Sequence, residues 1–561
     1  MKTIVFAVLI LAAITALGIY DSIRRRLRMI ADLEAEFGGR SKAKLSERRY
    51  ASIAAYRDSL LGRTYDIDSI TWNDLEMDRV FADLNRTCSA VGEEYLYAAL
   101  FRPEFSEDEL DRREKLISFF AEKKDVRLAM QIALSEMGKL RNISLYKYLQ
   151  SCDDVREDSM VWHILPCLGY VAGAVLAFLG HSGACAGVLL VTIAYSIVSY
   201  YRRKGEIEPY LQAVMFMSRW IGGIGQMRNK INAPDTIVGY ELESLEEQAK
   251  EFASFRRFTW LLGSNNDGGD PLQVAFDYLR MLTHIDLIKF NFMHRSIIDK
   301  NSEIRRLFTD TGRLDMAIAI ASYRAYRGED GWCLPKLTQD EAPLSFTDLC
   351  HPMIAEPVPN SLTTDGCILL TGSNASGKST FLKTIAINAL LAQTIHTVIG
   401  REYSGRYYRI FSSMALRDDL AAKESYYIVE IRSLKRILDS VEEGEPVLCF
   451  VDEVLRGTNT AERIAASSRI LEYLSEKGAY CFAATHDLEL TDILKNSFSM
   501  YHFSETVTEE NVTFDYTLKE GKATSRNAIL LLRLFGYPQE IVDSANREAE
   551  RFLARGEGGS V

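Results

Sequence analysis

The sequence predicts a multidomain protein in which an all-α region with transmembrane helices precedes a C-terminal α/β domain. Three observations lead to this prediction. The chain has 561 residues, more than one hydrophobic core usually organises. Charge-free apolar runs occur at 3–20 and 161–201, within a region of helical periodicity. From about residue 314 to residue 554, strands and helices alternate, which is typical of an α/β domain.

The composition is that of a folded protein, with 47% hydrophobic and 25% charged residues. A net charge of −11 argues against a broadly basic surface that coats nucleic acid, although it is compatible with a local basic patch. The nine cysteines contain no C-x-x-C pair and no metal-ligand spacing. This pattern favours free thiols in a reducing compartment.

The first apolar run, residues 3–20, is followed at once by the basic cluster Arg24 to Arg28. At about 1.5 Å per residue, the run nearly crosses a hydrocarbon layer of about 30 Å. A cleaved signal peptide is the alternative, but it would place its positive charge before the run, where only Lys2 stands. We therefore expect an uncleaved transmembrane anchor over residues 1–20, with the arginine cluster on the cytoplasmic side.

A basic linker over residues 21–70 is expected next. Between Asp21 and Tyr65 there are eleven Lys/Arg and six Asp/Glu. Such a segment can bind DNA, but beside a membrane anchor, contact with anionic lipid headgroups is the better explanation. Helical periodicity then predicts the first part of an all-α core over residues 71–160.

The stretch 161–201 has 41 residues and contains no Asp, Glu, Lys or Arg. At helical rise it is about 62 Å long, enough for two passes of a bilayer. The sequence Gly180-His181-Ser182-Gly183 predicts the turn between them, and Arg202-Arg203-Lys204 keeps both ends on the cytoplasmic side. We therefore expect a transmembrane helical hairpin. The alternative is a helical hairpin buried in a large soluble core.

Glycine pairs in this region predict close helix packing, and two histidines further along the chain are predicted to lie in the core. Gly169-x-x-x-Gly173 and Gly183-x-x-x-Gly187 have the spacing that lets apolar helices pack closely. The second part of the all-α core is predicted over residues 202–313. Its His284 and His294 lie amid apolar residues, where satisfied core histidines are a better explanation than metal ligands.

The α/β domain, predicted over 314–555 with a flexible tail at 556–561, contains a phosphate-binding loop. Gly372-Ser373-Asn374-Ala375-Ser376-Gly377-Lys378-Ser379-Thr380 includes the pattern G-x-x-x-x-G-K-[ST], between an apolar strand and a helical pattern. This order of elements aims backbone N–H groups and the positive end of a helix at an anion. We expect Lys378 to reach the β- and γ-phosphates of ATP and Ser379 to bind Mg²⁺.

Two further strands are predicted to end in reactive groups. The apolar run 446–451 ends in Asp452, a candidate Mg²⁺ ligand, and Glu453, a candidate base for the attacking water. The run 479–484 is followed by His486, which suits a γ-phosphate sensor. The sequence thus predicts Mg²⁺-dependent hydrolysis of ATP to ADP and phosphate, with Glu453, His486 and Lys378 as the catalytic residues.

The residues between these strands carry a family resemblance. Ser425, followed by an aromatic pair and Val429-Glu430, resembles the signature segment of the MutS family, a branch of the ABC-type ATPases. Similar to other family segments are Asp452 to Thr460, His351-Pro352, Thr371 to Asn374, Asp83 to Thr87, Phe101 to Pro103, Tyr516 to Ala528 and Phe535 to Pro538. The resemblance covers roughly residues 72–554. It implies an all-α MutS-like core, here with transmembrane helices, plus a C-terminal α/β P-loop ABC-type ATPase domain.

The resemblance also implies partners. It implies a homodimer through the ATPase domains, in which Ser425 of one subunit faces the γ-phosphate held by Lys378 of the other. It further implies DNA as a binding partner and a role in mismatch repair, DNA repair or recombination. The chain departs from the family in three respects. The long lever and clamp that encircle DNA in the family lack room, because the apolar hairpin interrupts the helical core. No Phe-x-Glu wedge stands ahead of the predicted core, and Lys423-Glu424 replace the glycine that precedes the signature serine.

We therefore expect a multi-pass protein of the inner (cytoplasmic) membrane, with its core and ATPase domain in the cytoplasm. It would contact membrane lipid and bind DNA in an ATP-dependent way without being a strict mismatch reader. The alternative is an ABC-type transporter, or a tethered mechanical ATPase without a DNA partner. Three spans are few for a transport pathway, and the sequence L-S-G-G-Q of transporters does not occur.

Overall fold

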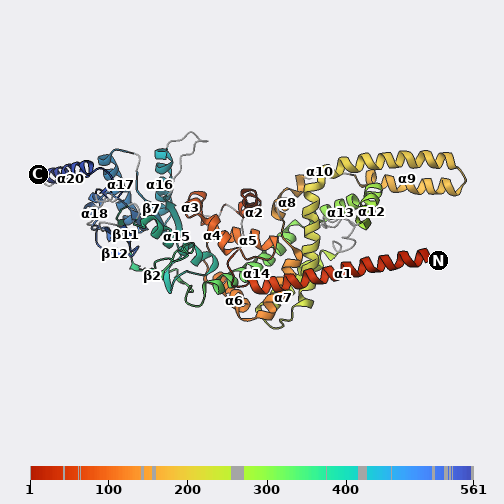
Figure 1. The fold of residues 1–561 in the computed structure, drawn as a ribbon, viewed down its shortest axis with the longest axis horizontal. Helices are drawn as coiled ribbons and strands as arrows, with labels where there is room; N and C mark the ends of the chain where they lie inside the picture. Colours follow the sequence, from red (N-terminus) through yellow and green to blue (C-terminus); the bar gives the residue numbers. More distant parts are fainter. Residues whose placement is uncertain are drawn as a thin grey trace. The chain divides into compact units, whose positions relative to one another are not determined.

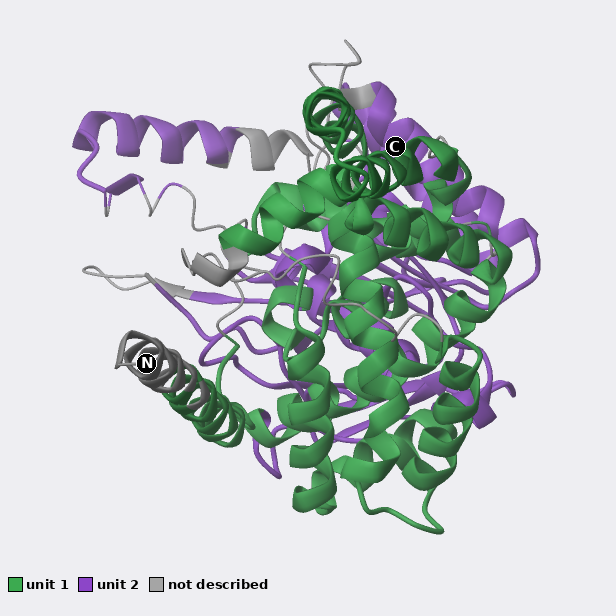
Figure 2. Cartoon of the chain, turned by 90° about the vertical axis from the view of Figure 1, so that its right-hand side faces the viewer, with its two compact units in different colours: residues 1–63, 81–99, 111–326 green, residues 64–80, 100–110, 327–561 purple. Residues whose placement is uncertain are grey.

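The structure is a computed structural model. It describes the chain except residues 1, 42–44, 61, 63–64, 141–143, 155–158, 254–270, 374–375, 415–425, 456–457, 508–511, 524–528, 530–531, 534 and 557–561. The chain forms two compact units (Figure 2). Unit 1 comprises residues 1–63, 81–99 and 111–326, and unit 2 comprises residues 64–80, 100–110 and 327–561.

Among the described residues, unit 1 is built from helices, as the sequence predicts. They are α1 (Lys2–Glu36), α2 (Glu47–Leu60), most of α5 (Ala90–Leu100), most of α6 (Glu107–Glu122), α7 (Lys124–Met137), α8 (Leu145–Ser151), α9 (Met160–Phe178), α10 (Ser182–Lys230), α11 (Ile237–Lys250), α12 (Pro271–Thr283), α13 (Ile285–Asp299) and α14 (Asn301–Arg327), with a short 3₁₀ turn η1 (Cys152–Asp154). Helix α4 (Met77–Leu84) begins in unit 2 and ends in unit 1. Aromatic packing of Trp220 and Tyr56 against Phe308 marks the core.

Helix α14 runs through residues 313 and 314, where the sequence analysis places the start of the ATPase domain. Two buried contacts keep its second half in unit 1. The Asp315 carboxylate accepts hydrogen bonds from the backbone N–H groups of Cys88 and Ser89, each at 2.8 Å. Arg324 forms a bidentate ion pair with Glu114 of α6, at 2.8 and 2.7 Å. The boundary between the units therefore lies near Arg327 rather than at residue 314.

Helices α9 and α10 form the predicted hairpin (Figure 1), with the turn between Phe178 and Ser182. The first glycine pair lies where the two helices touch. A Cβ atom at Gly169 would lie 2.4 Å from Thr192 Oγ1, and one at Gly173 would lie 2.7 Å from Leu189 Cδ2. The second pair makes no such close helix contact, because Gly183 and Gly187 face open space within the described structure. Close packing is therefore confirmed for the first pair alone.

The outer faces of the hairpin are apolar and exposed. Met160–Phe178 and Ser182–Glu208, with mean hydropathies of 1.7 and 1.8, are long and apolar enough to cross a membrane. Phe178 is 92% exposed, and Leu190 and Val198 are each 70% exposed. The predicted first span, residues 3–20, is helical within α1, and the side chains of its first part lie outside the described residues.

His284 and His294 are core residues that contact polar neighbours, as predicted. His284 and His294 are both buried. The Tyr148 hydroxyl lies 2.8 Å from His294 Nδ1, and His284 Nε2 lies 3.0 Å from the Ser196 carbonyl oxygen. Among the described residues, the structure brings no three His, Cys, Asp or Glu side chains together in a way that suits a metal ion.

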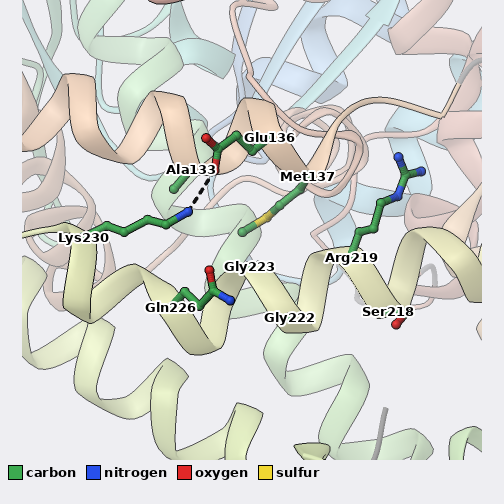
Figure 3. A pocket seen from close by; sticks show the side chains of 9 residues that line it. All are labelled: Ala133, Glu136, Met137, Ser218, Arg219, Gly222, Gly223, Gln226 and Lys230. Atoms are coloured by element: carbon green, nitrogen blue, oxygen red, sulfur yellow. Dashed lines mark hydrogen bonds and ion pairs between the residues drawn. The ribbon is translucent and has the colours of Figure 1, made fainter. Parts of the chain in front are cut away.

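Below the hairpin, α10 continues to Lys230 and packs against α7 (Figure 3). A Cβ atom at Gly223 would lie 2.9 Å from Met137 Cε, so this glycine sets the close approach of the two helices. Lys230 Nζ pairs with Glu136 across the groove at 2.9 Å. Beside them lies a cavity of about 380 Å³, and Glu136, the acidic residue of its lining, is paired with Lys230.

The described residues of unit 2 form an α/β domain with three sheets. The six-stranded sheet has the order β12-β9-β4-β8-β7-β6, in which every pairing but β12–β9 is parallel. Its strands are β4 (Cys367–Thr371), β6 (Arg409–Ser413), β7 (Val447–Asp452), β8 (Tyr480–Ala484), β9 (Phe498–His502) and β12 (Lys519–Glu520). The others are β1 (Lys336–Thr338), β2 (Leu344–Leu349), β3 (Asn360–Thr364) and β5 (Glu402–Arg406), and the pair β10 (Glu505–Val507) and β11 (Val512–Phe514). Its described helices include α15 (Lys378–Ile395), α16 (Tyr426–Glu442), α17 (Thr460–Glu476), α18 (Glu489–Ile493) and α20 (Gln539–Gly556).

Unit 2 also contains a segment that the sequence analysis divides between the linker and the helical core. Helix α3 (Ser69–Asp74) packs on the edge strand β6. The buried Asp74 carboxylate accepts hydrogen bonds from the Ser412 hydroxyl at 2.7 Å and from the Met414 N–H at 2.9 Å. Residues 64–80 belong to this unit because their side chains satisfy polar groups at the end of β6.

Candidate nucleotide-binding site

Three neighbouring strands of the large sheet end at one edge. The register pairs Leu370 of β4 with Ala484 of β8, and Ala484 with Asp452 of β7. Ligands of open α/β sheets bind at the carboxyl ends of such strands. The predicted phosphate loop, the His486 turn and the Asp452-Glu453 pair follow these three ends, so the fold brings all three segments together.

The phosphate loop depends on two glycines with positive φ. Gly372 has φ +139° and Gly377 has φ +100°, conformations that L side chains rarely adopt. A Cβ atom at Gly372 would lie 2.7 Å from the Phe503 carbonyl oxygen. Ser376 donates a hydrogen bond to the Ser373 carbonyl at 2.8 Å, which closes the turn. Asn374 and Ala375, two predicted contacts of the nucleotide, lie outside the described residues.

Lys378 opens helix α15 directly after the loop. Its Nζ donates hydrogen bonds to the carbonyl oxygens of Gly372 and Ser373, at 2.6 and 2.8 Å. Burial lowers the pKa of this ammonium, and the nearby Asp452 and Glu453 carboxylates oppose that shift. A partly desolvated ammonium group next to the backbone of a glycine-containing loop is suited to binding phosphate oxygens.

The predicted Mg²⁺ ligands touch each other. The Ser379 hydroxyl, in the first turn of α15, donates a hydrogen bond to the Asp452 carboxylate. Burial raises the pKa of Asp452, the negative charge of Glu453 adds to the rise, and the Ser379 hydrogen bond opposes it. Mg²⁺ prefers oxygen ligands and is commonly held by one or two protein groups plus substrate phosphates. A hydroxyl and a carboxylate in contact fit that requirement.

Glu453 and His486 also form a pair, with His486 Nε2 in contact with Glu453 Oε1. Glu453 adopts a left-handed backbone conformation, φ +57°, and its N–H donates to the Ala484 carbonyl at 2.9 Å. Left-handed non-glycine residues persist where surrounding contacts impose them, often at functional sites. Arg463 holds the turn after β8 by a bidentate ion pair with Asp487, at 2.8 and 2.6 Å.

Part of the predicted signature segment lies in helix α16. Ser425 lies outside the described residues, so its predicted contact with a second subunit stays a prediction. Helix α16 begins at Tyr426, directly after it. The buried Glu430 of α16 accepts a hydrogen bond from the Leu455 N–H at 2.6 Å. This contact ties the signature helix to the loop that follows Glu453.

A cavity of about 530 Å³ lies beside the start of α15. Its walls include His351, Tyr516 and residues 377–381, with Asn360 near Tyr516. Burial, aided by the positive charge of Lys383, lowers the pKa of His351 to about 4, so its imidazole is neutral at pH 7. The Asn360 amide donates to the Tyr516 carbonyl at 3.0 Å, which fixes the turn that carries the tyrosine ring. A neutral imidazole and an aromatic ring next to a phosphate loop suit a nucleotide base.

His351 and Tyr516 were not predicted from the sequence as site residues. Both occur in segments that carry the family resemblance, and that resemblance was the one signal available. Neither residue has a spacing relative to the loop that indicates base binding. Their role follows from the fold, which brings chain segments from either side of the loop to the same cavity.

The fold and the site define a P-loop nucleotide-binding domain. Residues 368–553 match the domain family described as MutS domain V. The chain is 30% identical to the DNA mismatch repair protein MutS of Leptospira interrogans over 331 residues, which are 55% of this chain and 38% of that protein. It is 29% identical to the protein of that name from Aquifex pyrophilus, over 57% of this chain and 38% of that protein. It is 34% identical to the DNA mismatch repair protein MutS of Thermus aquaticus, over 37% of this chain and 26% of that protein.

Unit 2 therefore contains a domain of the MutS domain V type, as the resemblance implies. The chain spans less than two fifths of the length of these relatives.

Proposed function

We propose that this chain is a membrane-anchored, MutS-type ATPase that works as a homodimer and couples ATP hydrolysis to DNA binding. One observation carries the catalytic part of the proposal. Lys378, the Ser379–Asp452 contact and the Glu453–His486 pair lie together at the carboxyl edge of one sheet. The match to MutS domain V favours this function over that of an ABC-type transporter.

Each group has a distinct task in hydrolysis. On binding ATP, Lys378 would replace its hydrogen bonds to the loop carbonyls with hydrogen bonds to the β- and γ-phosphate oxygens. Ser379 and Asp452 would hold Mg²⁺. The bound metal ion offsets phosphate charge. Glu453 would orient the attacking water and accept its proton. His486, in the turn after β8, contacts the Glu453 carboxylate and would sense the γ-phosphate. His351 and Tyr516 would hold the base.

The catalytic role of Glu453 is tested by Glu453→Gln, with Glu476→Gln at the exposed end of α17 as the matched control. We expect ATP binding to persist while turnover falls by roughly two to four orders of magnitude, the usual contribution of a positioned general base. The control should hydrolyse ATP at the wild-type rate. Unchanged steady-state hydrolysis in Glu453→Gln would remove Glu453 from the mechanism.

The dimer is tested by mixing two variants that are each expected to be inactive. Ser425→Ala lacks the signature group, and Lys378→Ala lacks the phosphate contact. A mixed dimer regains one complete site, with Lys378 from the first chain and Ser425 from the second. We expect hydrolysis to reappear on mixing. Verified mixed dimers without activity would contradict a composite site.

The membrane part of the proposal is supported by the exposed apolar hairpin and its basic flank. Single cysteines at Ser22 and Gly205 should be shielded from an impermeant thiol reagent in intact cells, and one at Ser182 should be labelled. The native Cys167 and Cys185 of the hairpin are replaced by alanine in all three variants. Labelling at Gly205 with protection at Ser182 would invert the topology, and a full chain that stays soluble without detergent would refute the membrane proposal.

The DNA part of the proposal is supported by similarity to proteins named DNA mismatch repair protein MutS. Binding should depend mainly on phosphates, with log affinity falling linearly as log salt rises. Without the Phe-x-Glu wedge, the preference for mismatched over matched duplex should stay below about tenfold. A preference of about a hundredfold or more would identify a mismatch reader. Absence of DNA binding at any salt would favour the tethered mechanical ATPase.

A further inference from the structure

A cavity of about 370 Å³ lies at the open end of the α9–α10 hairpin, within unit 1. Its walls come from the first turn of α9 and from the part of α10 where the charge-free stretch ends. The lining combines exposed or half-buried aromatic groups with basic side chains. It comprises Trp162, His163, Tyr195, Val198, Ser199, Arg202, Arg203 and Glu206.

The cavity lies at a definite distance from the hairpin turn. Trp162 and Val198 are each about 18 residues from Gly180, on opposite sides of the turn, so each lies about 27 Å from it along its helix. The hydrocarbon layer of a bilayer is about 30 Å thick. If the turn reaches one face of a membrane, the cavity lies at the headgroup level of the opposite face. This inference therefore rests on the proposed insertion of the hairpin.

The charges in the cavity leave one cation available. Arg203 is buried, and its guanidinium donates to the Glu206 carboxylate at 3.0 Å, so these two groups largely neutralise each other. Arg202 is exposed and makes no hydrogen bond or ion pair with any residue that the structure describes. It is also the first charged residue after the apolar stretch.

The histidine that lines the cavity, His163, is buried and lies against His284. His284 Nε2 lies 3.0 Å from the Ser196 carbonyl oxygen, which accepts and cannot donate, so His284 carries its proton on Nε2. In its neutral form, His284 Nδ1 then accepts from His163 Nδ1, 3.4 Å away. Both rings thus have partners inside the fold, and Arg202 remains as the exposed cation of the lining, which suits a ligand with a single negative charge.

We propose that this cavity binds the phosphodiester headgroup of an anionic phospholipid of the cytoplasmic leaflet. Arg202 contacts the phosphate, and the exposed Trp162 and half-buried Tyr195 flank it at the interface, where aromatic side chains are favoured. The acyl chains follow the exposed apolar faces of α9 and α10, including Val161 and Val198, which are 66% and 70% exposed. A phosphodiester matches the single net charge, whereas a phosphomonoester carries nearly two.

The test is a titration of the detergent-purified full chain with phosphatidylglycerol and with phosphatidylcholine of the same acyl chains, followed by native mass spectrometry. The variants are Arg202→Gln and, as matched control, Lys204→Gln. Lys204 carries the same charge two residues away but donates to the Tyr200 hydroxyl at 3.2 Å and does not line the cavity. We expect one phosphatidylglycerol to bind at least about tenfold more tightly than phosphatidylcholine, as one charge-assisted hydrogen bond provides.

Arg202→Gln should remove that preference, and Lys204→Gln should change it less than about threefold. Equal binding of the two lipids, or equal losses in the two variants, would overturn the proposal. Displacement of the lipid by millimolar glycerol phosphate would also overturn it and assign the cavity to a soluble phosphate compound. A chain that stays soluble without detergent refutes the membrane proposal itself, so the two failures are distinguishable.

Discussion

The buried Glu94 of α5 predicts an unusual pH dependence of stability. Its side chain is fully buried, and it accepts hydrogen bonds from the Ser144 hydroxyl at 2.9 Å and from the Leu145 N–H at 3.0 Å. Burial raises the pKa of this carboxyl to about 8, although both hydrogen bonds oppose the shift. The native state therefore holds a proton on Glu94 at neutral pH that the unfolded chain, with an ordinary pKa of 4.5, has released.

The sign follows from this difference. The contribution of Glu94 to stability is complete below about pH 4.5 and is lost as the pH rises towards about 8. At pH 7 the loss is about 3 kcal/mol, since one pKa unit corresponds to about 1.4 kcal/mol. Glu94→Gln copies the protonated acid, because its oxygen accepts from Leu145 and its NH₂ group donates to Ser144. We expect this variant to be more stable than wild type by about 3 kcal/mol at pH 7 and nearly equal to it at pH 4.5.

The measurement is urea-dependent unfolding of the detergent-purified chain by pulse proteolysis at several pH values between 4.5 and 8. Glu93→Gln is the matched control. Glu93 forms a buried ion pair with Arg49 and accepts from the Asn85 amide at 2.8 Å. Breaking a buried pair costs about 3–5 kcal/mol, so this variant should be less stable. A difference between Glu94→Gln and wild type that does not grow with pH would refute the reasoning.

Three further outcomes are expected. Lys378→Ala should weaken ATP binding by roughly 10- to 100-fold in calorimetric titrations, the value of a charged hydrogen bond. Burial raises the pKa of Asp452, so as the pH is lowered the apparent Mg²⁺ affinity of the ATP-loaded protein should begin to fall at a higher pH than it would with an ordinary aspartate. Asp452→Asn should abolish this pH dependence. Gly169→Val should force Thr192 aside and lower stability in detergent by about 1–3 kcal/mol, whereas Gly187→Val, in open space, should not.

The parts of the site that were predicted from sequence are encoded by short segments. The glycines of the phosphate loop stand between a strand and a helix that are each recognisable from a few residues. Asp452 and Glu453 come directly after a buried strand, and His486 lies two residues beyond another. Because parallel strands end at one edge of a sheet, three local patterns were sufficient to predict where these side chains meet.

The parts that were not predicted depend on contacts between distant segments. Asp74 belongs to unit 2 because it binds Ser412 and Met414, which lie more than 300 residues further along the chain. Tyr516 reaches the nucleotide cavity through a turn that Asn360 holds. A single sequence carries no periodicity or spacing that reports such pairs, and the predicted boundary inside α14 is misplaced for the same reason.

Amino-acid composition does not distinguish a membrane hairpin from a core hairpin, whereas the exposure of side chains in the fold bears on the difference. A charge-free helix pair is equally compatible with a soluble core and with a membrane, because both are apolar environments. In the structure, Gly169 and Gly173 face the partner helix, while Phe178 and Leu190 lie on faces that are largely exposed. A core hairpin would be covered on those faces, whereas Met160–Phe178 and Ser182–Glu208 are mostly uncovered. We propose that these faces lie in the apolar layer of a membrane, where Arg202, at the end of the stretch, would meet the charged headgroups.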